Sequence, residues 1–129
     1  FDESSFDWVM CNHVLEHIPD DRRAMHEIFR VLKPGGKALL QVPYSLQLEK
    51  TFEDASITSK AGREKYFGQF DHVRIYGRDY PERLEEAGFI VHQISWEKHF
   101  KNVKMPDKFA VNPEELLFVC EKPLKPGRL

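Results

Sequence analysis

The sequence predicts an α/β fold organised around a strand–helix–strand unit, and three apolar patterns near the amino terminus predict it. Residues Phe6 to Cys11 end in four successive apolar side chains and stop at polar Asn12, which is typical of a strand buried in a parallel sheet. Residues Ala38 to Val42 form a second short apolar run of the same kind. Between these runs, apolar residues recur at helical spacing: Met25, Ile28, Phe29 and Leu32.

The predicted helix has recognisable start and stop signals. Asp20 and Asp21 follow Pro19, and aspartates at this point can accept hydrogen bonds from the free amides of a helix start. The Pro34-Gly35-Gly36 segment is expected to stop the helix, because proline cannot continue it and glycine allows a tight reversal. Short connections on both sides predict a right-handed crossover and parallel strands.

The middle of the chain has a weaker pattern. We interpret residues 45–76 as an excursion over the sheet edge, with a loop at 56–62 and an aromatic-rich stretch at 66–76. A stretch of this length without regular structure usually has a function or is mobile. We therefore expect the excursion to lie over a binding site.

The last part of the chain predicts one more helix and two strands. Asp79 and Glu82 have capping-box spacing at a helix start, and Gly88 ends that helix. Strands are expected over the apolar stretches 89–96 and 116–120. The segment between them, residues 98–113, is predicted to be a polar connection.

Composition limits the class of protein. The chain has 129 residues and a formal charge of −2, from 19 basic and 21 acidic side chains, so we expect no nucleic-acid or membrane partner. No apolar run approaches the roughly 18 residues of a membrane span. Cys11 and Cys120 each lie in an apolar run, so we predict free thiols and a reducing, cytoplasmic location. The chain opens on a core strand without Met or leader, which favours a piece of something longer.

Two blocks of sequence carry a family resemblance. The first is FDWVMCNHVLEHIP at residues 6–19, and the second is EIFRVLKPGG at residues 27–36. Together they closely resemble class I S-adenosylmethionine-dependent methyltransferases, and more narrowly the small bacterial type 11 group. The resemblance continues through DHVRIYG at residues 71–77 and LEEAGF at residues 84–89. It implies a Rossmann-like sheet, S-adenosyl-L-methionine as cofactor and methyl transfer to a small-molecule acceptor.

The chain also departs from the family pattern. These enzymes hold the cofactor mainly with a glycine-rich turn after strand one and an acidic residue at the end of strand two. No G-x-G occurs in the sequence, and Gly35-Gly36 follows a predicted helix instead of a strand. The resemblance therefore implies only the carboxy-terminal half of the fold, strands four to seven with the last strand antiparallel.

The missing pattern has a functional consequence. In the family's strand order, 3-2-1-4-5-7-6, the ligand crevice lies between strands one and four. We therefore expect a partial domain over residues 1–123 that lacks the cofactor-binding half, with a flexible tail over residues 124–129. Such a chain has one wall of the crevice, so we expect it to be inactive in isolation.

Asn12 and His13 are the candidate cofactor-binding residues, because the resemblance puts them at the end of strand four. His13 is also the candidate catalytic residue, since a neutral imidazole can orient or deprotonate an acceptor. The alternatives are plain: Asn12 can simply cap the strand end, and His13 can be a polar residue leading into the next helix.

Glu16 and His17 follow His13 at helical spacing, which places the three side chains on one face of a helical turn. A related quinone-precursor methyltransferase group has a similar trio that binds a divalent metal. In this sequence His13 stands where that trio has an acid, so we predict no metal site. The alternative role of Glu16 and His17 is to join the loop to the following helix.

Tyr44, His72 and Arg74 are the candidate substrate-binding residues. Tyr44 follows the predicted second strand, on the same rim as His13. His72 and Arg74 share one face of an extended segment and can hold an anionic acceptor group. The alternatives are packing for Tyr44 and a structural salt bridge to the acidic excursion for His72 and Arg74.

Two further expectations concern packing and partners. The first strand lacks its neighbour, so its edge is expected either to pair with a second copy and give a homodimer or to leave the chain poorly stable. A non-enzymatic partner-binding half-domain is the alternative, and an unrelated α/β enzyme such as a nucleotide-sugar transferase is disfavoured by the motif blocks. The predicted core comprises Trp8, Met10, Ile28, Leu32, Leu39, Phe89, Phe118 and Val119.

Overall fold

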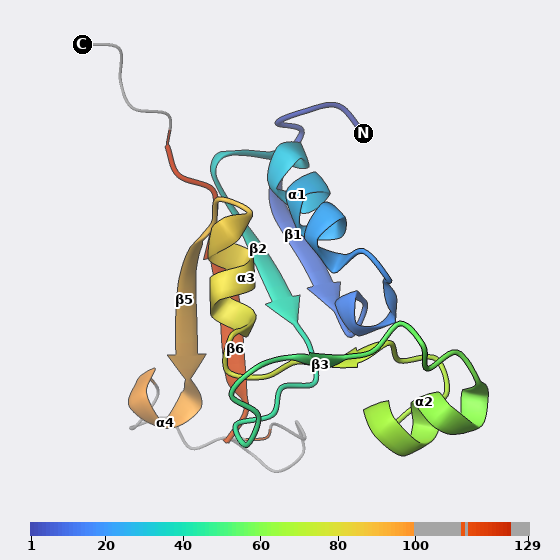
Figure 1. Ribbon diagram of the computed structural model, residues 1–129. Coiled ribbons are helices and arrows are strands. Elements are labelled where there is room, and N and C mark those ends of the chain that lie inside the picture. Colours follow the sequence, from blue (N-terminus) through green and yellow to red (C-terminus); the bar gives the residue numbers. More distant parts are fainter. Residues whose placement is uncertain (100–111, 113, 125–129) are drawn as a thin grey trace.

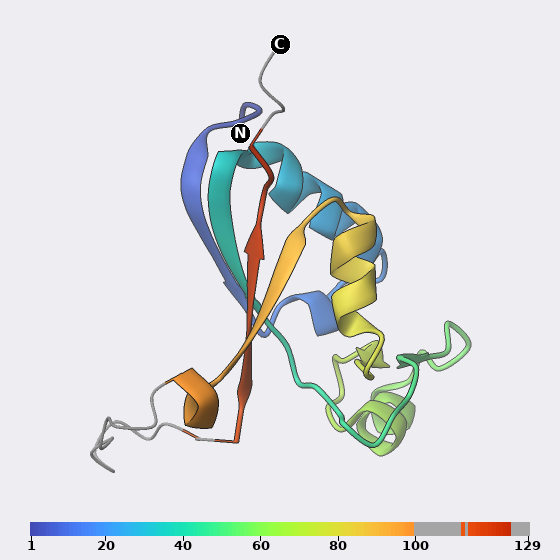
Figure 2. The ribbon, with the colours of Figure 1, turned by 90° about the vertical axis from the view of Figure 1, so that its left-hand side faces the viewer.

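The computed structural model describes residues 1–99, 112 and 114–124. Its centre is a four-stranded sheet in the order β1-β2-β6-β5. The strands span Phe6–Asn12 (β1), Leu32–Gln41 (β2), Leu116–Glu121 (β6) and Ile90–Ser95 (β5). Helices α1 (Asp21–Val31) and α3 (Tyr80–Glu86) lie on the same face of this sheet (Figures 1 and 2).

The predicted strand–helix–strand unit is confirmed. Strands β1 and β2 are parallel, with Met10 opposite Leu39, and α1 connects them. Asp20 caps α1 as expected, because its side chain accepts a hydrogen bond of 3.0 Å from the Arg23 amide.

The predicted end of this helix is wrong. Helix α1 ends at Val31 and β2 begins at Leu32, ahead of the Pro34-Gly35-Gly36 segment that was expected to stop the helix. Residues before a proline avoid the helical region, so the chain is already extended when it reaches Pro34. Gly35 has a φ of +78°, and the β1–β2 register shifts in the same region.

The second half of the sheet is antiparallel. Strand β6 pairs antiparallel with both β2 and β5, so it lies between them although it is last in the chain. This confirms the expectation that the last strand is antiparallel.

The excursion contains more regular structure than predicted. It carries strands β3 (Phe52–Glu53) and β4 (Arg74–Ile75), which pair with each other, and helix α2 (Lys60–Phe67). The loop predicted at 56–62 is wrong in its second part, because Ser59 caps α2 by accepting a 3.0 Å hydrogen bond from the Gly62 amide. The excursion lies beyond the ends of β1 and β2 to which their arrows point (Figure 1).

Helix α3 begins after Asp79, but without the expected capping box. Asp79 makes no capping bond. Its Oδ1 instead accepts hydrogen bonds from the amide (2.7 Å) and hydroxyl (2.6 Å) of Thr51. Asp79 thus ties the excursion to α3.

The core lies between the two helices and the sheet face that they cover. Its fully buried side chains include Met25, Leu40, Tyr80, Phe118 and Cys120. Of the predicted core, Leu32, Phe89 and Phe118 are buried, whereas Ile28, Leu39 and Val119 are partly buried.

Trp8 and Met10 were predicted in the core, and this is wrong. They are 60% and 72% exposed. Side chains alternate along a strand, so when Val9 and Cys11 pack against the core, Trp8 and Met10 point to the opposite face of the sheet. The described helices α1 and α3 do not cover that face.

Cys11 and Cys120 are free, and burial raises the pKa of the Cys120 thiol to about 12. Short helix α4 (Trp96–His99) follows β5 and begins the predicted polar connection, most of which lies outside the described residues. The predicted tail also lies outside them after Leu124. None of the helices in the described part of the chain has the length and apolar character that a membrane crossing requires.

Candidate functional site

A cavity of about 610 Å³ lies where β1 ends and the excursion approaches it. Its lining includes the 3₁₀ helix η1 (Leu15–His17), the loop after β2 and the segment that precedes β4. The polar side chains that line it are His13, Glu16, His17, Gln69, His72 and Arg74.

His13 is the first residue beyond β1 and has an unusual backbone. Its φ is 54°, in the left-handed region that non-glycine residues rarely adopt. Its amide donates a 2.8 Å hydrogen bond to the carbonyl of Gln41, the last residue of β2. This bond holds the backbone of His13 in its conformation. The side chain is 59% exposed and lines the cavity. A strained residue at a cavity mouth favours a functional role.

Glu16 is the most deeply buried charged side chain at the cavity, with 1% of its surface exposed. Its Oε1 lies 3.6 Å from His13 Nδ1 and 3.7 Å from His17 Nε2. Both distances exceed a hydrogen bond. Oε2 has no hydrogen-bond partner. A buried carboxyl group left in this state is costly, which marks it for a ligand or a proton.

His17 is held by the excursion. Its Nδ1 lies 3.3 Å from both the backbone oxygen and the Oδ2 of Asp71. An Nδ1–H that donates to Asp71 leaves Nε2, on the Glu16 side, as the ring nitrogen with a free electron pair.

His72 completes a group that we call the histidine cluster: His13, Glu16, His17 and His72. The His72 ring is almost buried and meets the His17 ring edge to face, with centroids 4.6 Å apart. The Val73 amide donates a 2.9 Å hydrogen bond to the Glu16 carbonyl, which holds this segment against η1. The excursion therefore brings a histidine from far along the chain to Glu16 and His17.

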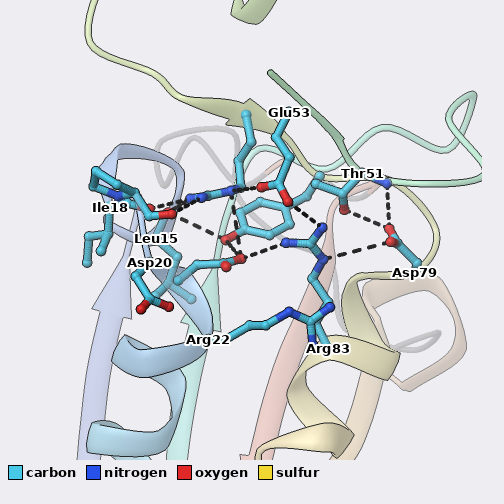
Figure 3. Close-up of polar contacts among 12 residues, drawn as sticks. Leu15, Ile18, Asp20, Arg22, Thr51, Glu53, Asp79 and Arg83 are labelled. Carbon is cyan, nitrogen blue, oxygen red and sulfur yellow. Dashed lines mark hydrogen bonds and ion pairs between the residues drawn. The ribbon is translucent and has the colours of Figure 1, made fainter. Parts of the chain in front are cut away.

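A second polar group lies at the same helix η1 and has a different character. We call it the arginine network, and it comprises Asp21, Glu53, Arg74, Tyr76 and Arg83 (Figure 3).

Arg74 uses all its nitrogens within the protein. Nη1 donates to the carbonyls of Leu15 (2.7 Å) and Ile18, and Nη2 donates to the Pro19 carbonyl at 2.8 Å. Nε donates to Glu53 Oε2 at 2.8 Å. The structural salt bridge to the acidic excursion, one alternative for Arg74, is thus confirmed.

Arg83 and Tyr76 complete the network around Asp21. Arg83 donates to Asp21 Oδ2 at 3.0 Å and to Glu53 Oε1 at 3.1 Å, and the Tyr76 hydroxyl donates to Asp21 Oδ2 at 2.7 Å. Burial and the adjacent Asp21 charge raise the pKa of Tyr76 well above its usual value, so the hydroxyl stays a donor.

The predicted site residues divide into three groups. His13 and His72 line the main cavity, and Arg74 reaches it as part of the arginine network. Tyr44 lies with His13 at a neighbouring cavity of about 550 Å³, its ring packed edge to face on Phe118 with centroids 5.2 Å apart. Asn12 is exposed at the end of β1 and lines neither cavity.

Sequence reasoning missed Asp71, which positions His17, and the contact between His17 and His72. The only signal for either was the DHVR segment, in which both Asp71 and His72 occur.

Comparisons with known proteins agree with the motif blocks. Residues 1–40 match the family model described as "Methyltransferase domain". The chain is 33% identical over 89 residues to a probable S-adenosylmethionine-dependent methyltransferase of Mycolicibacterium smegmatis, a match that covers 69% of this chain and 30% of the relative. It is 30% identical over 112 residues to demethylmenaquinone methyltransferase of Lactococcus lactis, covering 77% and 44%. The chain thus spans less than half of these relatives.

Solved structures show the same α/β methyltransferase fold. A putative methyltransferase from Bacillus halodurans superimposes with a TM-score of 0.57 at 21% identity, covering 95% of this chain and 67% of that one. The [4+2]-cyclase SpnF superimposes with a TM-score of 0.59 at 16% identity, covering 96% and 53%. Because a cyclase has this fold as well, the fold by itself does not fix the reaction.

Proposed function

We propose that this chain is the acceptor-side part of an S-adenosylmethionine-dependent methyltransferase that acts on a small molecule. The observation that carries the proposal is the position of the methyltransferase-type segment Asn12-His13-Val14-Leu15-Glu16-His17. It follows a parallel strand at its carboxyl end and lines a cavity large enough for a small ligand.

The sheet order supports a finer assignment. The order β1-β2-β6-β5, with antiparallel β6, corresponds to 4-5-7-6 in the family's sheet. On this assignment β1 is strand four, and the cofactor crevice lies beyond its free edge, with Asn12 and His13 on one wall. The residues present fit S-adenosylmethionine only in part, because the sequence has no G-x-G turn to form the other wall of the cofactor crevice. We therefore expect this chain alone neither to hold S-adenosylmethionine nor to transfer a methyl group.

Methyl transfer requires little acid–base catalysis from the protein. S-adenosylmethionine, when bound, supplies an activated methyl group for in-line displacement. The protein then has to align the acceptor and exclude water. We assign His13 as the group that accepts the acceptor's proton, and Tyr44 and His72 as acceptor contacts. Arg74 was also a candidate contact, but each of its three nitrogens already donates a hydrogen bond within the protein, so we assign it to holding η1 in place.

Calorimetry with S-adenosylhomocysteine tests this proposal. The 129-residue chain is expected to give no binding heat, whereas a protein extended upstream of Phe1 by the natural reading frame is expected to bind. The upstream DNA sequence sharpens the result: an in-frame strand, glycine-rich turn and helix supports the proposal, and a stop codon contradicts it. Micromolar affinity of the 129-residue chain itself would contradict the one-wall assignment.

The free edge of β1 is the proposed interface with a second copy of this chain. Strand β1 is at the end of the sheet, and its unpaired backbone groups can add a strand from another chain. Light scattering at micromolar concentration is expected to give the mass of a dimer. A well-folded monomer under these conditions contradicts the homodimer.

A further inference from the structure

We propose that the main cavity binds the methyl acceptor through an organic ammonium group, so that the substrate class is an amine. This inference rests on the proposed function and adds the chemistry of the methyl acceptor. It follows from the charges and the hydrogen-bonding groups of the described residues that line the cavity. Apart from the histidines, two of these residues are ionisable, Glu16 and Arg74.

The charge of Arg74 is compensated inside the protein. Its Nε donates to Glu53 Oε2 at 2.8 Å and lies 3.7 Å from Asp21 Oδ2. Its two Nη atoms donate to backbone carbonyls. An anionic group of the methyl acceptor, which His72 and Arg74 were expected to hold, would therefore find no unpaired arginine among the described residues of this cavity.

Glu16 is the opposite case. Its side chain is 2% exposed, and its Oε2 has no hydrogen-bond partner. The imidazole nitrogens nearest to Oε1 in the described part of the chain lie 3.6 and 3.7 Å away. A buried carboxylate in this state is costly, and a cationic ligand beside it removes much of that cost.

Glu16 and His17 also present two hydrogen-bond acceptors to each other. His17 Nδ1 lies 3.3 Å from the backbone oxygen and from the Oδ2 of Asp71, so an Nδ1–H that donates there leaves the free electron pair on Nε2. Nε2 and Glu16 Oε1 are 3.7 Å apart. A ligand nitrogen at about 2.9 Å from both atoms fits this spacing, and an ammonium group has an N–H for each. A hydroxyl group has a single O–H and satisfies only one of them.

The neighbouring cavity has the same sign of charge. It shares His13 and Pro43 with the main cavity. Its described lining residues include Glu114 and Glu115, both exposed, but no lysine or arginine. Acidic side chains at a cavity mouth raise the local concentration of cationic ligands. Both cavities therefore favour a positively charged methyl acceptor over a negatively charged one.

The arrangement also suits the proton transfer that an amine requires. An ammonium group has to lose one proton before the nitrogen lone pair forms the N–C bond, while the S–C bond of the methyl donor breaks and leaves its electron pair on sulfur. His13 takes this proton on a ring nitrogen. Glu16 Oε1, 3.6 Å from His13 Nδ1, then stabilises the resulting imidazolium.

NMR titration of the 129-residue chain with matched probes tests the inference. The probes are benzylammonium, benzyl alcohol and benzoate, which share one ring and carry a positive, a neutral or a negative head group. Benzylammonium is expected to shift the amide signals of residues 13–17 and 67–72, with a dissociation constant on the order of 1 mM for so small a ligand. Benzyl alcohol is expected to bind at least about fivefold more weakly, and benzoate is expected to leave these signals unchanged.

Glu16→Gln removes the charge and keeps the shape of the side chain. It is expected to weaken benzylammonium binding at least about fivefold and to affect benzyl alcohol binding much less. Glu86→Gln is the matched control, because it removes the same charge from a side chain that is 57% exposed on α3, and it is expected to bind benzylammonium as wild type does. The comparison of the probes on wild type needs no variant, so the inference stays testable if Glu16→Gln fails to fold.

Benzoate binding as tight as benzylammonium binding, or unchanged affinity of Glu16→Gln for benzylammonium, would overturn the inference. The measurement needs neither cofactor nor methyl transfer, so it is separate from the test of the proposed function. If the extended protein binds S-adenosylhomocysteine and the cavity shows no preference for benzylammonium, this inference is wrong and the proposed function stands. If benzylammonium binds at the cavity and the extended protein does not bind S-adenosylhomocysteine, the ammonium site stands and the proposed function is wrong.

Discussion

The histidine cluster and the arginine network lie at the same short helix, η1, but differ in how fully their polar groups are paired. In the arginine network, Asp21 Oδ2 accepts from Tyr76 and Arg83, and Arg74 donates to three carbonyls and a carboxylate. In the histidine cluster, Glu16 Oε2 has no hydrogen-bond partner, and the imidazole nitrogens nearest to Oε1 in the described part of the chain lie 3.6 and 3.7 Å away, beyond a hydrogen bond. The comparison indicates that a saturated buried network fixes the fold, whereas an unsaturated one leaves capacity for a ligand.

The two groups therefore have different roles: the arginine network holds the backbone, and the histidine cluster faces the cavity. Arg74 holds the carbonyls of Leu15, Ile18 and Pro19, so it fixes the backbone that presents Glu16 and His17 to the cavity. The network's pairing is nearly complete, with Arg83 Nε as its exception: this atom lies 3.8 Å from Asp79 Oδ2 without a hydrogen bond.

The largest effect on this comparison is expected from Arg74→Met. The change removes the donor that Arg74 supplies to the Leu15, Ile18 and Pro19 carbonyls and one of the two arginine partners of Glu53, so the free energy of unfolding should fall by about 3–5 kcal/mol. Urea denaturation measures it. Arg22→Ala is the control, because Arg22 pairs with Glu86 at the surface, where such pairs contribute at most about 1 kcal/mol. Equal losses in the two variants would contradict a saturated, structural network.

A matched pair of carboxyl-to-amide changes gives the next largest contrast. Asp21→Asn weakens two hydrogen bonds to a charged group and should cost about 2 kcal/mol of unfolding free energy. Glu16→Gln removes no hydrogen bond made by the described residues, so it should change stability by less than about 1 kcal/mol. Urea midpoints of both variants are the measurement. A larger loss in Glu16→Gln than in Asp21→Asn would reverse the comparison.

The pH dependence of stability tests Glu53, the partly exposed carboxylate of the arginine network. Burial works to raise the pKa of Glu53, but hydrogen bonds from Arg74 and Arg83 outweigh it, so the pKa lies below its ordinary value. Such a carboxylate stabilises the fold above its unfolded pKa of about 4.3, and this contribution is lost as the pH falls through the folded pKa.

We therefore expect Glu53→Gln to cost about 1 kcal/mol at pH 7, because a half-solvated ion pair contributes little more. The variant should also lose less stability than wild type as the pH is lowered from about 5 to 3. Urea titrations at several pH values measure both effects, and Glu86→Gln is the surface control. An unchanged acid profile would show that Glu53 does not contribute through its charge.

The smallest effect, and one of opposite sign, is expected from His13→Gly. The backbone of His13 has a φ of 54°, which glycine adopts without strain, so the variant should be more stable by about 0.5–1 kcal/mol. Thermal unfolding measures the gain. A loss of stability would mean that the imidazole contributes more to the fold than its exposed position indicates.

The sequence was sufficient for the parts of the fold that depend on local patterns. The strand–helix–strand unit follows from periodicity, and the Asp20 cap follows from capping chemistry. The start of the helix after Asp79 was also predicted, but for the wrong reason, because Asp79 makes no side-chain capping bond. The exposure of Trp8 and Met10 was not predictable in this way. Four apolar residues in a row indicate a strand covered on both faces, and sequence pattern does not reveal that the described helices cover only one.

The candidate site was predictable only in part. The motif blocks pointed to His13, Glu16 and His17, and they are at the cavity. The approach of His72 to His17, and the capture of Arg74 by η1, depend on how the excursion folds back. Nothing in residue spacing predicts such a contact between distant segments, because it is set by tertiary packing.

The exposed indole of Trp8 gives this molecule an optical reporter. Tryptophan in water fluoresces at longer wavelength than tryptophan in an apolar contact. A partner strand or helix that docks beside β1 would therefore shift the emission of Trp8 to the blue, while Trp96, on the far side of the sheet order, serves as an internal reference.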